Sequence, residues 1–576
     1  MEKDFQVQGG NDAALFTLKI HRGDGMALLA MDWKKNRPPQ DFVGFAIEYK
    51  EPGGNKFFAL SNRLAFPAGS GAVNPNRMST LLSPIQKWRW VHFPRNAEIE
   101  GEFTYRVTPV FMDEQDKLSY GEPQQCALAL ARETYPGRLN VTYTRGFISS
   151  QAFVDRYAAT AQDMKKLLPA KAAAGVTFKP THLKAAEALA WMGFEARSAI
   201  LELLDQAIEK DKKAQVRVVA YDLSQEEVVS RLKKLKKRLR IVIDDSKEHG
   251  HKDSGESQSA RILEKTAGKA NVKRQHMGNL QHNKTIVIDG PKVSAVVCGS
   301  TNFTWRGLYV QSNNAMVLRG KTAAKVFSDA FDAYWANDKP SDFGATASAA
   351  WNDLKLAGID AQVAFCPLAG KNSQLDRIAK DVEKTRSSLF FSLAFLYQTE
   401  GAMQDAVKKL ARNPDLFVYG ISDKKVKGLT QGIDFQKPDG KVKVVNPQAL
   451  SGNVPEPFKS EPTGGGGNRM HHKFLVIDFD KPDARVYLGS YNFSIAADGK
   501  NGENLLLVRD RRIAVSYMIE ALRIFDHHHF RVAQKEAKSA RKKLQLKKPP
   551  RKAGEKPWWQ EDYVNARKIR DRELFC

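Results

Sequence analysis

The stretch HNKTIVID at residues 282–289 recurs as HHKFLVID at residues 471–478, and this repeat dominates the organisation of the chain. In each copy a histidine and a lysine two positions apart precede a mostly apolar run. Side chains alternate along a strand, so the imidazole and the ammonium are expected on one face of a strand buried on both sides. The two histidines lie 471 − 282 = 189 residues apart, which predicts a duplicated unit.

A second short motif follows each copy. CGSTNF contains Ser300 and Asn302, and LGSYNF contains Ser490 and Asn492. Counted from the histidine, the lysine, aspartate, serine and asparagine stand at offsets 2, 7, 18 and 20 in the first copy and 2, 7, 19 and 21 in the second. In each copy the serine and the asparagine follow an apolar run and are two positions apart, so they are expected on the same face of a strand. We therefore expect a histidine to meet groups that donate hydrogen bonds to phosphate oxygens.

The segments around both motifs alternate between helical and strand patterns. SAILELLDQAIEK at 198–210 has helical periodicity and VRVVAYDL at 216–223 reads as a strand. The same order recurs in QLDRIAKDVEKTR at 374–386 and SLFFSLAF at 388–395. This alternation predicts mixed α/β units. The polar segment at about 246–275 is expected to be a mobile loop.

Residues 1–145 have the pattern of a separate β-domain. Short alternating runs such as FVGFAIEY at 42–49 and FTYRVTPVF at 103–111 are separated by turn-forming residues, which predicts an antiparallel sandwich. FTYRVTPVF resembles a strand of fibronectin type III or immunoglobulin-like modules. By analogy, this domain is expected to dock a partner.

The last segment, 536–576, is a basic tail that includes Trp558, Trp559 and Tyr563. Basic groups suit a phosphate backbone and aromatic rings stack on bases. Packing of the same rings onto the folded domain is an equal alternative.

Composition narrows the partners and the compartment. The chain has 576 residues, a net charge of +25 and a pI near 9.6. This charge favours a polyanionic partner, with nucleic acid first and an anionic membrane second, although many proteins are basic without such a partner. The sequence contains no apolar run of about 18 residues, so no membrane span is predicted. The four cysteines form no CxxC pair, so we expect a reducing cytoplasm.

The two HxKxxxxD motifs, each followed by GSxN, resemble the signature of the phospholipase D superfamily. The resemblance covers about 146–535. It implies two pseudo-symmetric α/β halves, 146–345 and 346–535, with one active site between them. It also implies phosphodiester cleavage through a phosphohistidine, without a metal or other cofactor. The site would be complete within one chain, which leaves oligomerisation open.

Many members of this superfamily have an acidic residue eleven positions after the asparagine. Glu503 stands there in the second copy, whereas the first copy has Asn313. A carboxylate beside an imidazole raises its pKa more than an amide does. If each residue supports the histidine of its own half, His471 is the proton donor and His282 is the nucleophile that attacks phosphorus.

The remaining residues are assigned to holding the substrate or the strands. We expect Lys284, Lys473, Asn302 and Asn492 to hold the phosphate oxygens. Ser300 and Ser490 are second contacts, and Asp289 and Asp478 order the strand ends. Arg274 and Arg469 precede the two motifs and are expected to contact flanking phosphates.

The sequence is consistent with three functions. The first is a metal-independent nuclease, for which the charge and the two complete motifs argue. The second is a phospholipase D or phosphatidyl transferase. The third is a non-catalytic scaffold that binds nucleic acid, against which both intact histidine–lysine pairs argue. DNA and RNA, strandedness, and internal and terminal cleavage are not distinguished.

Overall fold

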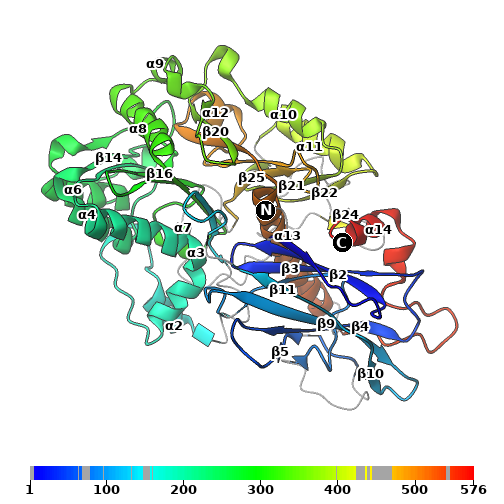
Figure 1. Cartoon of the computed structure of the whole chain (residues 1–576). Helices are drawn as coiled ribbons and strands as arrows, with labels where there is room; N and C mark the ends of the chain where they lie inside the picture. Colours follow the sequence, from blue (N-terminus) through cyan, green and yellow to red (C-terminus); the bar gives the residue numbers. More distant parts are fainter. Residues whose placement is uncertain are drawn as a thin grey trace. The chain divides into compact units, whose positions relative to one another are not determined.

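The computed structural model describes residues 5–576 except 63, 68–77, 95, 131–132, 147–152, 154–155, 158–159, 397–398, 423–434, 437–441, 444–469 and 540–544. Side chains are also left undescribed at 161, 371, 435–436, 442–443 and 528–539. The chain forms two compact units (Figure 1). Unit 1 comprises 1–132, 435–443 and 515–576, and unit 2 comprises 133–434 and 444–514.

Unit 1 contains the expected all-β region of antiparallel sheets, which is thereby confirmed. One sheet has the strand order β1 (Gln6–Gln8), β2 (Phe16–Gly23), β3 (Met26–Trp33), β8 (Arg89–His92). A second sheet has the order β10 (Leu118–Tyr120), β9 (Glu102–Met112), β4 (Phe42–Lys50), β5 (Phe58–Ala59), and β11 (Gln124–Ala129) also pairs with β9. Burial alternates along much of β9, as expected for a strand with one face on a core.

The C-terminal tail packs onto this sandwich. Trp559 is 6% exposed within its core. The Trp558 ring stacks on Trp88 at 5.5 Å between centroids, and its Nε1 donates to the Phe42 carbonyl oxygen at 3.1 Å. Helix α14 (Ala566–Glu573) follows, and Arg572 pairs with Asp32. Of the two readings of the tail, packing is therefore the one observed, and 546–576 form part of the β-domain.

Unit 2 contains two seven-stranded mixed sheets. The first has the order β12 (Leu139–Tyr143), β18 (Asn314–Arg319), β17 (Ser294–Gly299), β16 (Lys284–Asp289), β13 (Gln215–Ala220), β14 (Leu239–Ile243), β15 (Val272–Arg274). The second has the order β19 (Asn352–Asp353), β20 (Asp360–Cys366), β27 (Glu503–Arg509), β26 (Arg485–Gly489), β25 (Lys473–Ile477), β21 (Ser388–Leu393), β22 (Phe417–Ile421).

The two sheets repeat one topology, which confirms the expected pair of α/β halves. Strands β12 to β14 along the first sheet correspond in order to β20 to β22 along the second, with each motif strand, β16 or β25, between the same neighbours. Strand β12 pairs with β18 in this unit. The strand at 139–143 therefore lies in the first α/β half, although the sequence placed the boundary of the β-domain at 145.

Helices cover the sheets of unit 2. In the first half, α8 (Lys321–Ala336) lies near β16 (Figure 1) and packs on β16 and β17. Helix α3 (Ala185–Asp205) packs on β12 and β18. The other α-helices that the structure describes in this unit are α2 (Ala161–Leu167), α4 (Glu226–Leu235), α5 (Lys247–Gly250), α6 (Gly255–Ala267), α7 (Trp305–Tyr309), α9 (Pro340–Gly344), α10 (Leu375–Glu383), α11 (Ala402–Arg412) and α12 (Ile495–Gly499). Helix α13 (Arg511–Ser539) begins in unit 2 and continues in unit 1. Within the described ranges, none of the helices has the length and apolarity to cross a bilayer.

The prediction of a mobile loop at about 246–275 is wrong, because most of this segment forms the helices α5 and α6. The Ser254 hydroxyl caps α6 by accepting from the backbone N–H of Ser257 at 3.1 Å. Ala260, Leu263 and Ala267 are buried at helical spacing. The segment looks polar in sequence because its serines and glutamates serve as caps and network residues.

Candidate active site

The motif residues meet because their strands are neighbours. Lys284 begins β16 and His282 stands just before it, while β17 delivers Ser300 and Asn302 beyond its last residue, Gly299. Gly299 and its counterpart Gly489 have φ values of 135° and 133°. A Cβ at Gly489 would lie 2.2 Å from the Asn504 carbonyl oxygen. Glycine is therefore required at the end of each of these strands.

Two short backbone pairings join the halves at the site. Gln281, which precedes His282, forms a parallel bridge with Gly502, which precedes Glu503. Ser312, which precedes Asn313, forms a parallel bridge with Met470, which precedes His471. The two bridges are related by exchange of the halves. Each bridge places a histidine beside the residue that stands eleven positions after the motif asparagine of the other half. These pairs are His282 with Glu503 and His471 with Asn313.

His282 is paired with the carboxylate of the second half. Its Nδ1 lies 2.8 Å from Oε2 of Glu503, and the two residues are 4% and 0% exposed. Burial lowers the pKa of His282, and the Glu503 carboxylate opposes that effect. The expectation that Glu503 supports His471 of its own half is therefore wrong.

His471 is paired with an amide of the first half. Its Nδ1 lies 2.8 Å from Oδ1 of Asn313 and 3.1 Å from the carbonyl oxygen of Ser300. Burial lowers the pKa of His471 well below its usual value, and the charges of Lys473 and Lys284 lower it further. Both histidines thus share one electrostatic environment, but among the described residues only His282 contacts a carboxylate.

The two lysines make the site electropositive. Lys284 donates to the carbonyl oxygen of His282, and Lys473 donates to that of His471 at 2.9 Å. The ring of Tyr221 lies 4.6 Å from the Lys284 ammonium. Burial lowers the pKa of Lys284 to about 8 and that of Lys473 well below its usual value. A bound anion would offset this cost.

The two asparagines each present an unpaired acceptor. Among the described residues, neither Oδ1 of Asn302 nor Oδ1 of Asn492 has a hydrogen-bond partner, although both atoms are buried. The Asn302 amide donates to a carboxylate oxygen of Asp222. Buried polar atoms are nearly always satisfied, so both side chains are suited to a polar ligand.

The two serines hold strands together. Ser300 Oγ donates to Oδ1 of Asn313 at 3.0 Å and to Oδ1 of Asn314 at 2.9 Å. Ser490 Oγ accepts from the backbone N–H of Asn504 at 3.0 Å. Through Asn313, Ser300 also fixes the amide that contacts His471.

The motif aspartates lie at the ends of their strands, away from the histidines. Asp289 is exposed, and its carboxylate lies 3.6 Å from the Arg217 guanidinium. Asp478 is buried and accepts from the backbone N–H groups of Arg386 at 3.0 Å and Ser387 at 2.8 Å. Asp478 thereby orders the start of β21.

Of the two arginines expected at flanking phosphates, the structure describes Arg274. Arg274 donates to the carbonyl oxygens of Asp244 at 2.9 Å and His249 at 2.7 Å and to the Ser257 hydroxyl at 3.0 Å, so it holds the chain before α6. Arg469 lies outside the described residues.

Sequence reasoning missed the aromatic residues and the acidic cluster beside the site. The ring centroid of Tyr221 lies 4.7 Å from that of His282, and the Phe395 centroid lies 6.3 Å from that of His471. Asp222 and Asp244 follow the neighbouring strands β13 and β14. The signal was present, because both carboxylates stand at the ends of apolar runs, VRVVAYDL at 216–223 and LRIVIDD at 239–245.

The chain is similar to known proteins in its α/β part. A family model described as cardiolipin synthase, PLD-like domain, matches residues 200–335 and 381–525. Phospholipase D from Rickettsia prowazekii (strain Madrid E) and from Rickettsia typhi (strain ATCC VR-144 / Wilmington) are each 44% identical over 48 residues, which is 8% of this chain and 22% of theirs. The chain therefore spans about a fifth of the length of these curated relatives.

Two solved structures are also similar. Phosphatidylserine synthase from Haemophilus influenzae Rd KW20 is 15% identical with a TM-score of 0.40, over 66% of this chain and 93% of that chain. Nuc, a phospholipase D family member from Salmonella typhimurium, is 25% identical with a TM-score of 0.20, over 24% of this chain and 87% of that chain.

Proposed function

We propose that this chain, which belongs to the phospholipase D superfamily, is a phosphodiesterase that cleaves nucleic acid through a phosphohistidine. The observation that carries the proposal is the exchange of support between the halves. Each histidine is held at Nδ1 by a side chain of the other half, at 2.8 Å in both cases. Two imidazoles and two ammonium groups are thereby available to one phosphodiester.

His282 is the nucleophile in this proposal. The Glu503 carboxylate accepts a hydrogen bond from the Nδ1–H group of His282, so the lone pair of the ring is on Nε2. When Nε2 bonds to phosphorus, the ring becomes positive, and the buried carboxylate stabilises that charge. The assignment is the one expected from sequence, but the reason differs, because the carboxylate supports the nucleophile itself.

His471 is the proton carrier. Its Nδ1 donates to the Asn313 amide and the Ser300 carbonyl, so the lone pair is on Nε2, which lies 3.1 Å from the Lys473 ammonium. The anionic diester raises the pKa of His471, which then protonates the leaving oxygen as the phosphorus–oxygen bond breaks. Nε2 next removes a proton from water. The water oxygen bonds to phosphorus, the nitrogen–phosphorus bond breaks, and His282 is restored.

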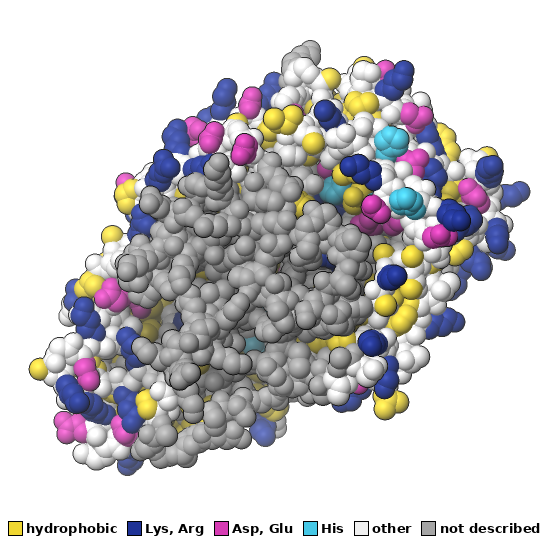
Figure 2. Space-filling model, turned by 180° about the vertical axis from the view of Figure 1, so that it is seen from behind, with side chains coloured by type: hydrophobic (Ala, Val, Ile, Leu, Met, Phe, Trp, Pro, Cys, Tyr) yellow, Lys and Arg dark blue, Asp and Glu magenta, His cyan; other side chains and the backbone are white. Residues whose placement is uncertain are grey.

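Charge supports nucleic acid as the substrate. The net charge of +25 provides a general attraction for a phosphate backbone. Figure 2 shows Lys and Arg side chains spread over the described part of one face. In the described part of unit 2, the large apolar side chains that are exposed are Leu183 and Ile495. Two such residues provide little surface for docking on a bilayer.

A phospholipid is the second candidate substrate. It is favoured by the relatives named phospholipase D, which are similar to this chain over 48 residues. The same histidines would perform the same chemistry on a lipid headgroup diester, because the motifs determine the bond that is cleaved and not the molecule that contains it.

Labelled DNA, labelled RNA and phospholipid vesicles, each incubated with the full chain in EDTA, distinguish these substrates. We expect cleavage of nucleic acid that is lost in His282→Ala and retained in the control Asp289→Asn, whose carboxylate is exposed at the far end of β16. Turnover of lipid alone would replace the proposed substrate. Cleavage that survives His282→Ala would contradict the proposed site.

Trapping the intermediate tests the assignment of the histidines. Rapid acid quench followed by mass spectrometry of the phosphopeptide is expected to locate the phosphate on His282. Phosphate on His471 would reverse the two roles.

A further inference from the structure

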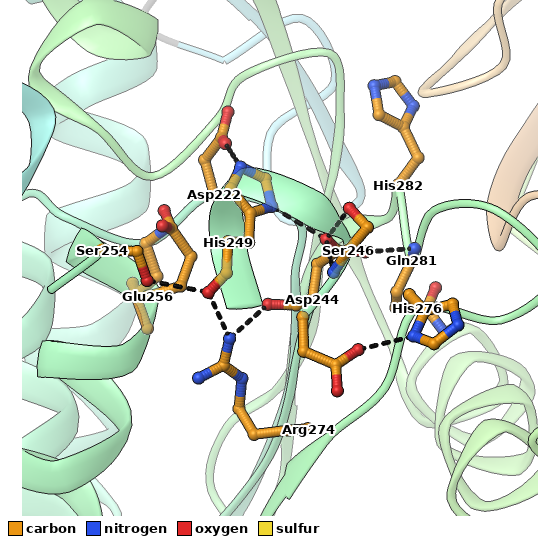
Figure 3. A network of polar contacts seen from close by, with 12 residues as sticks. Asp222, Asp244, Ser246, His249, Ser254, Glu256, Arg274, His276, Gln281 and His282 are labelled. Atoms are coloured by element: carbon orange, nitrogen blue, oxygen red, sulfur yellow. Dashed lines mark hydrogen bonds and ion pairs between the residues drawn. The ribbon is translucent and has the colours of Figure 1, made fainter. Parts of the chain in front are cut away.

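A buried polar network centred on His249 lies beside the active site (Figure 3). His249 Nε2 is 2.8 Å from Oδ1 of Asp222, and Nδ1 is 2.8 Å from Oδ2 of Asp244. Asp244 is fully buried, and the carbonyl oxygen of His249 accepts from Arg274 and Ser254, both at 2.7 Å. The network is therefore anchored by both the side chain and the backbone of His249.

The imidazole in this network is a cation. Both ring nitrogens face carboxylate oxygens at hydrogen-bonding distance, so both donate. Burial lowers the pKa of His249, but the bonds to Asp222 and Asp244 outweigh burial and raise the pKa to about 11. The nearby ligand atoms of Asp222, His249 and Glu256 lie within 4.8 Å of one another. An imidazole that donates at both nitrogens has no lone pair for a metal.

The network reaches the active site at two points. Asp222 accepts a hydrogen bond from the side-chain amide of Asn302. Asp244 Oδ1 accepts from the backbone N–H of Gln281, the residue before His282, at 2.7 Å. The Tyr221 ring packs on both His249 and His282, with centroid distances of 4.6 Å and 4.7 Å. Displacement of His249 would therefore affect a phosphate-site amide and the nucleophile together.

Among the described residues, the Asp222 contact belongs to the first half alone. The N–H of Tyr221 donates to the Asn283 carbonyl at 2.9 Å, and the N–H of Ala394 donates to the His472 carbonyl at 3.2 Å. This shared register aligns Asp222 with Phe395. The second half thus has an aromatic ring at the position from which Asp222 holds Asn302.

We propose that Asp222 and His249 form a positioning pair that fixes the Asn302 amide and the backbone before His282 for binding of a phosphodiester. This proposal rests on the proposed function in one respect, namely that the site binds a phosphate group. Asp222 fixes which end of the amide is Nδ2, because a flipped amide would place oxygen against a carboxylate. The His249 cation offsets the negative charge that Asp222 brings close to the substrate.

Asp222→Asn tests positioning against simple charge. The variant keeps the shape of the side chain but no longer selects one orientation of Asn302. We expect kcat on bis(4-nitrophenyl) phosphate to fall about tenfold to hundredfold, as is typical when the support of a site residue is lost. We also expect the Kd of inorganic phosphate, measured by calorimetry, to rise severalfold. If Asp222 were only a nearby negative charge, phosphate binding would tighten and kcat would not change, which overturns the proposal.

Asp245→Asn is the matched control, because Asp245 pairs with His276 at 2.8 Å, and none of its described contacts is with Asn302 or His249. Both variants should keep the thermal midpoint of the parent within a few degrees. Under these conditions the control should show parental kcat and phosphate affinity. An equal loss of kcat and phosphate affinity in Asp245→Asn would mean that either change disturbs the segment around Asp244 and His249 in general. That result would overturn the specific role of Asp222.

A third measurement does not need turnover. Nitrogen-15 NMR of the histidine-labelled full chain should show His249 protonated at both nitrogens at pH 8 and neutral at that pH in Asp222→Asn. A neutral His249 in the parent would overturn the pair. If the parent cleaves no diester, the proposed function fails, while phosphate binding and the His249 signal still decide the positioning pair.

Discussion

At the residue scale, the two active-site histidines differ in what contacts Nδ1. His282 faces the Glu503 carboxylate and His471 faces the Asn313 amide. A carboxylate stabilises a positive ring far better than an amide does. One chemical difference between the two halves is therefore this pair of side chains, each in the half opposite to the histidine that it supports.

Glu503→Gln tests this inequality. The variant keeps the size of the side chain but removes the charge that stabilises the phosphorylated ring of His282. We expect the single-turnover rate of intermediate formation to fall about 10²- to 10⁴-fold, the range for loss of a positioned catalytic group. Asn313→Asp, which gives His471 a carboxylate, is expected to leave this step much less affected. Equal effects of the two changes would contradict the assignment of His282 as nucleophile.

The pKa of Lys284 predicts a pH limit. Burial lowers this pKa from 10.5 to about 8, so the ammonium loses its proton as the pH rises through about 8. Substrate binding needs the cation, and kcat/KM reports the free enzyme, so kcat/KM is expected to fall above pH about 8. In Lys284→Arg the guanidinium stays charged, so the part of the alkaline limb that Lys284 contributes should disappear, whereas the part contributed by Lys473, whose pKa burial also lowers, should remain. A limb at pH 10 or above would show that the lysine is not buried in the free enzyme.

The sign for stability follows from the same shift. The folded state binds the Lys284 proton more weakly than the unfolded state does. The contribution of this group to the free energy of unfolding therefore rises with pH between about 8 and 10.5.

At the element scale, the ends of β17 and β26 determine whether the asparagine motifs reach the site. Gly299 and Gly489 end these strands in a conformation with positive φ. At each of them the neighbouring strand approaches so closely that a side chain would collide with its backbone. The glycines in the two GSxN motifs are thus explained by strand geometry, without a role in chemistry.

Gly489→Ala tests this point. Its Cβ would lie 2.2 Å from the Asn504 carbonyl oxygen, and alanine disfavours the positive φ. We expect a loss of about 1–3 kcal/mol in the free energy of unfolding, measured by urea denaturation. Gly499→Ala is the control, because its Cβ would meet nothing within 4 Å. Unchanged stability of Gly489→Ala would mean that β26 and β27 are further apart than described.

At the scale of the whole molecule, the C-terminal residues complete the β-domain. Trp559 lies in the core of the sandwich, and the Phe575 side chain is 0% exposed. The carbonyl oxygen of Phe575 is 2.6 Å from Nε2 of His21. The aromatic rings that suggested base stacking in the sequence instead pack against neighbouring aromatic side chains: Trp558 stacks on Trp88, and Tyr563 meets Trp88 and Trp559 edge-on.

Trp559→Ala distinguishes the two uses of the tail. Removal of a buried tryptophan is expected to cost about 3–5 kcal/mol of stability. We expect a lower midpoint of the transition that reports the β-domain, followed by near-ultraviolet circular dichroism. Lys556→Ala, an exposed position in the same segment, should leave that midpoint unchanged. Weakened binding of DNA by Trp559→Ala at full stability would instead support stacking on bases.

Much of the architecture follows from motif spacing. The offset of two between histidine and lysine, and between serine and asparagine, predicts that the members of each pair lie on one face, because side chains alternate along any strand. Recurrence of the motifs predicts two similar halves, and the structure repeats one strand order in both. These features depend on local geometry, which neighbouring residues determine.

The contacts across the site required the packed halves. Glu503 and His282 are 221 positions apart, and the bridge between Gln281 and Gly502 determines that they meet. The His249 network likewise depends on α5, which local composition did not predict. Such contacts arise where the strand ends of two sheets come together. The alternation of side chains along a single strand contains no information about which residues of the two sheets then meet.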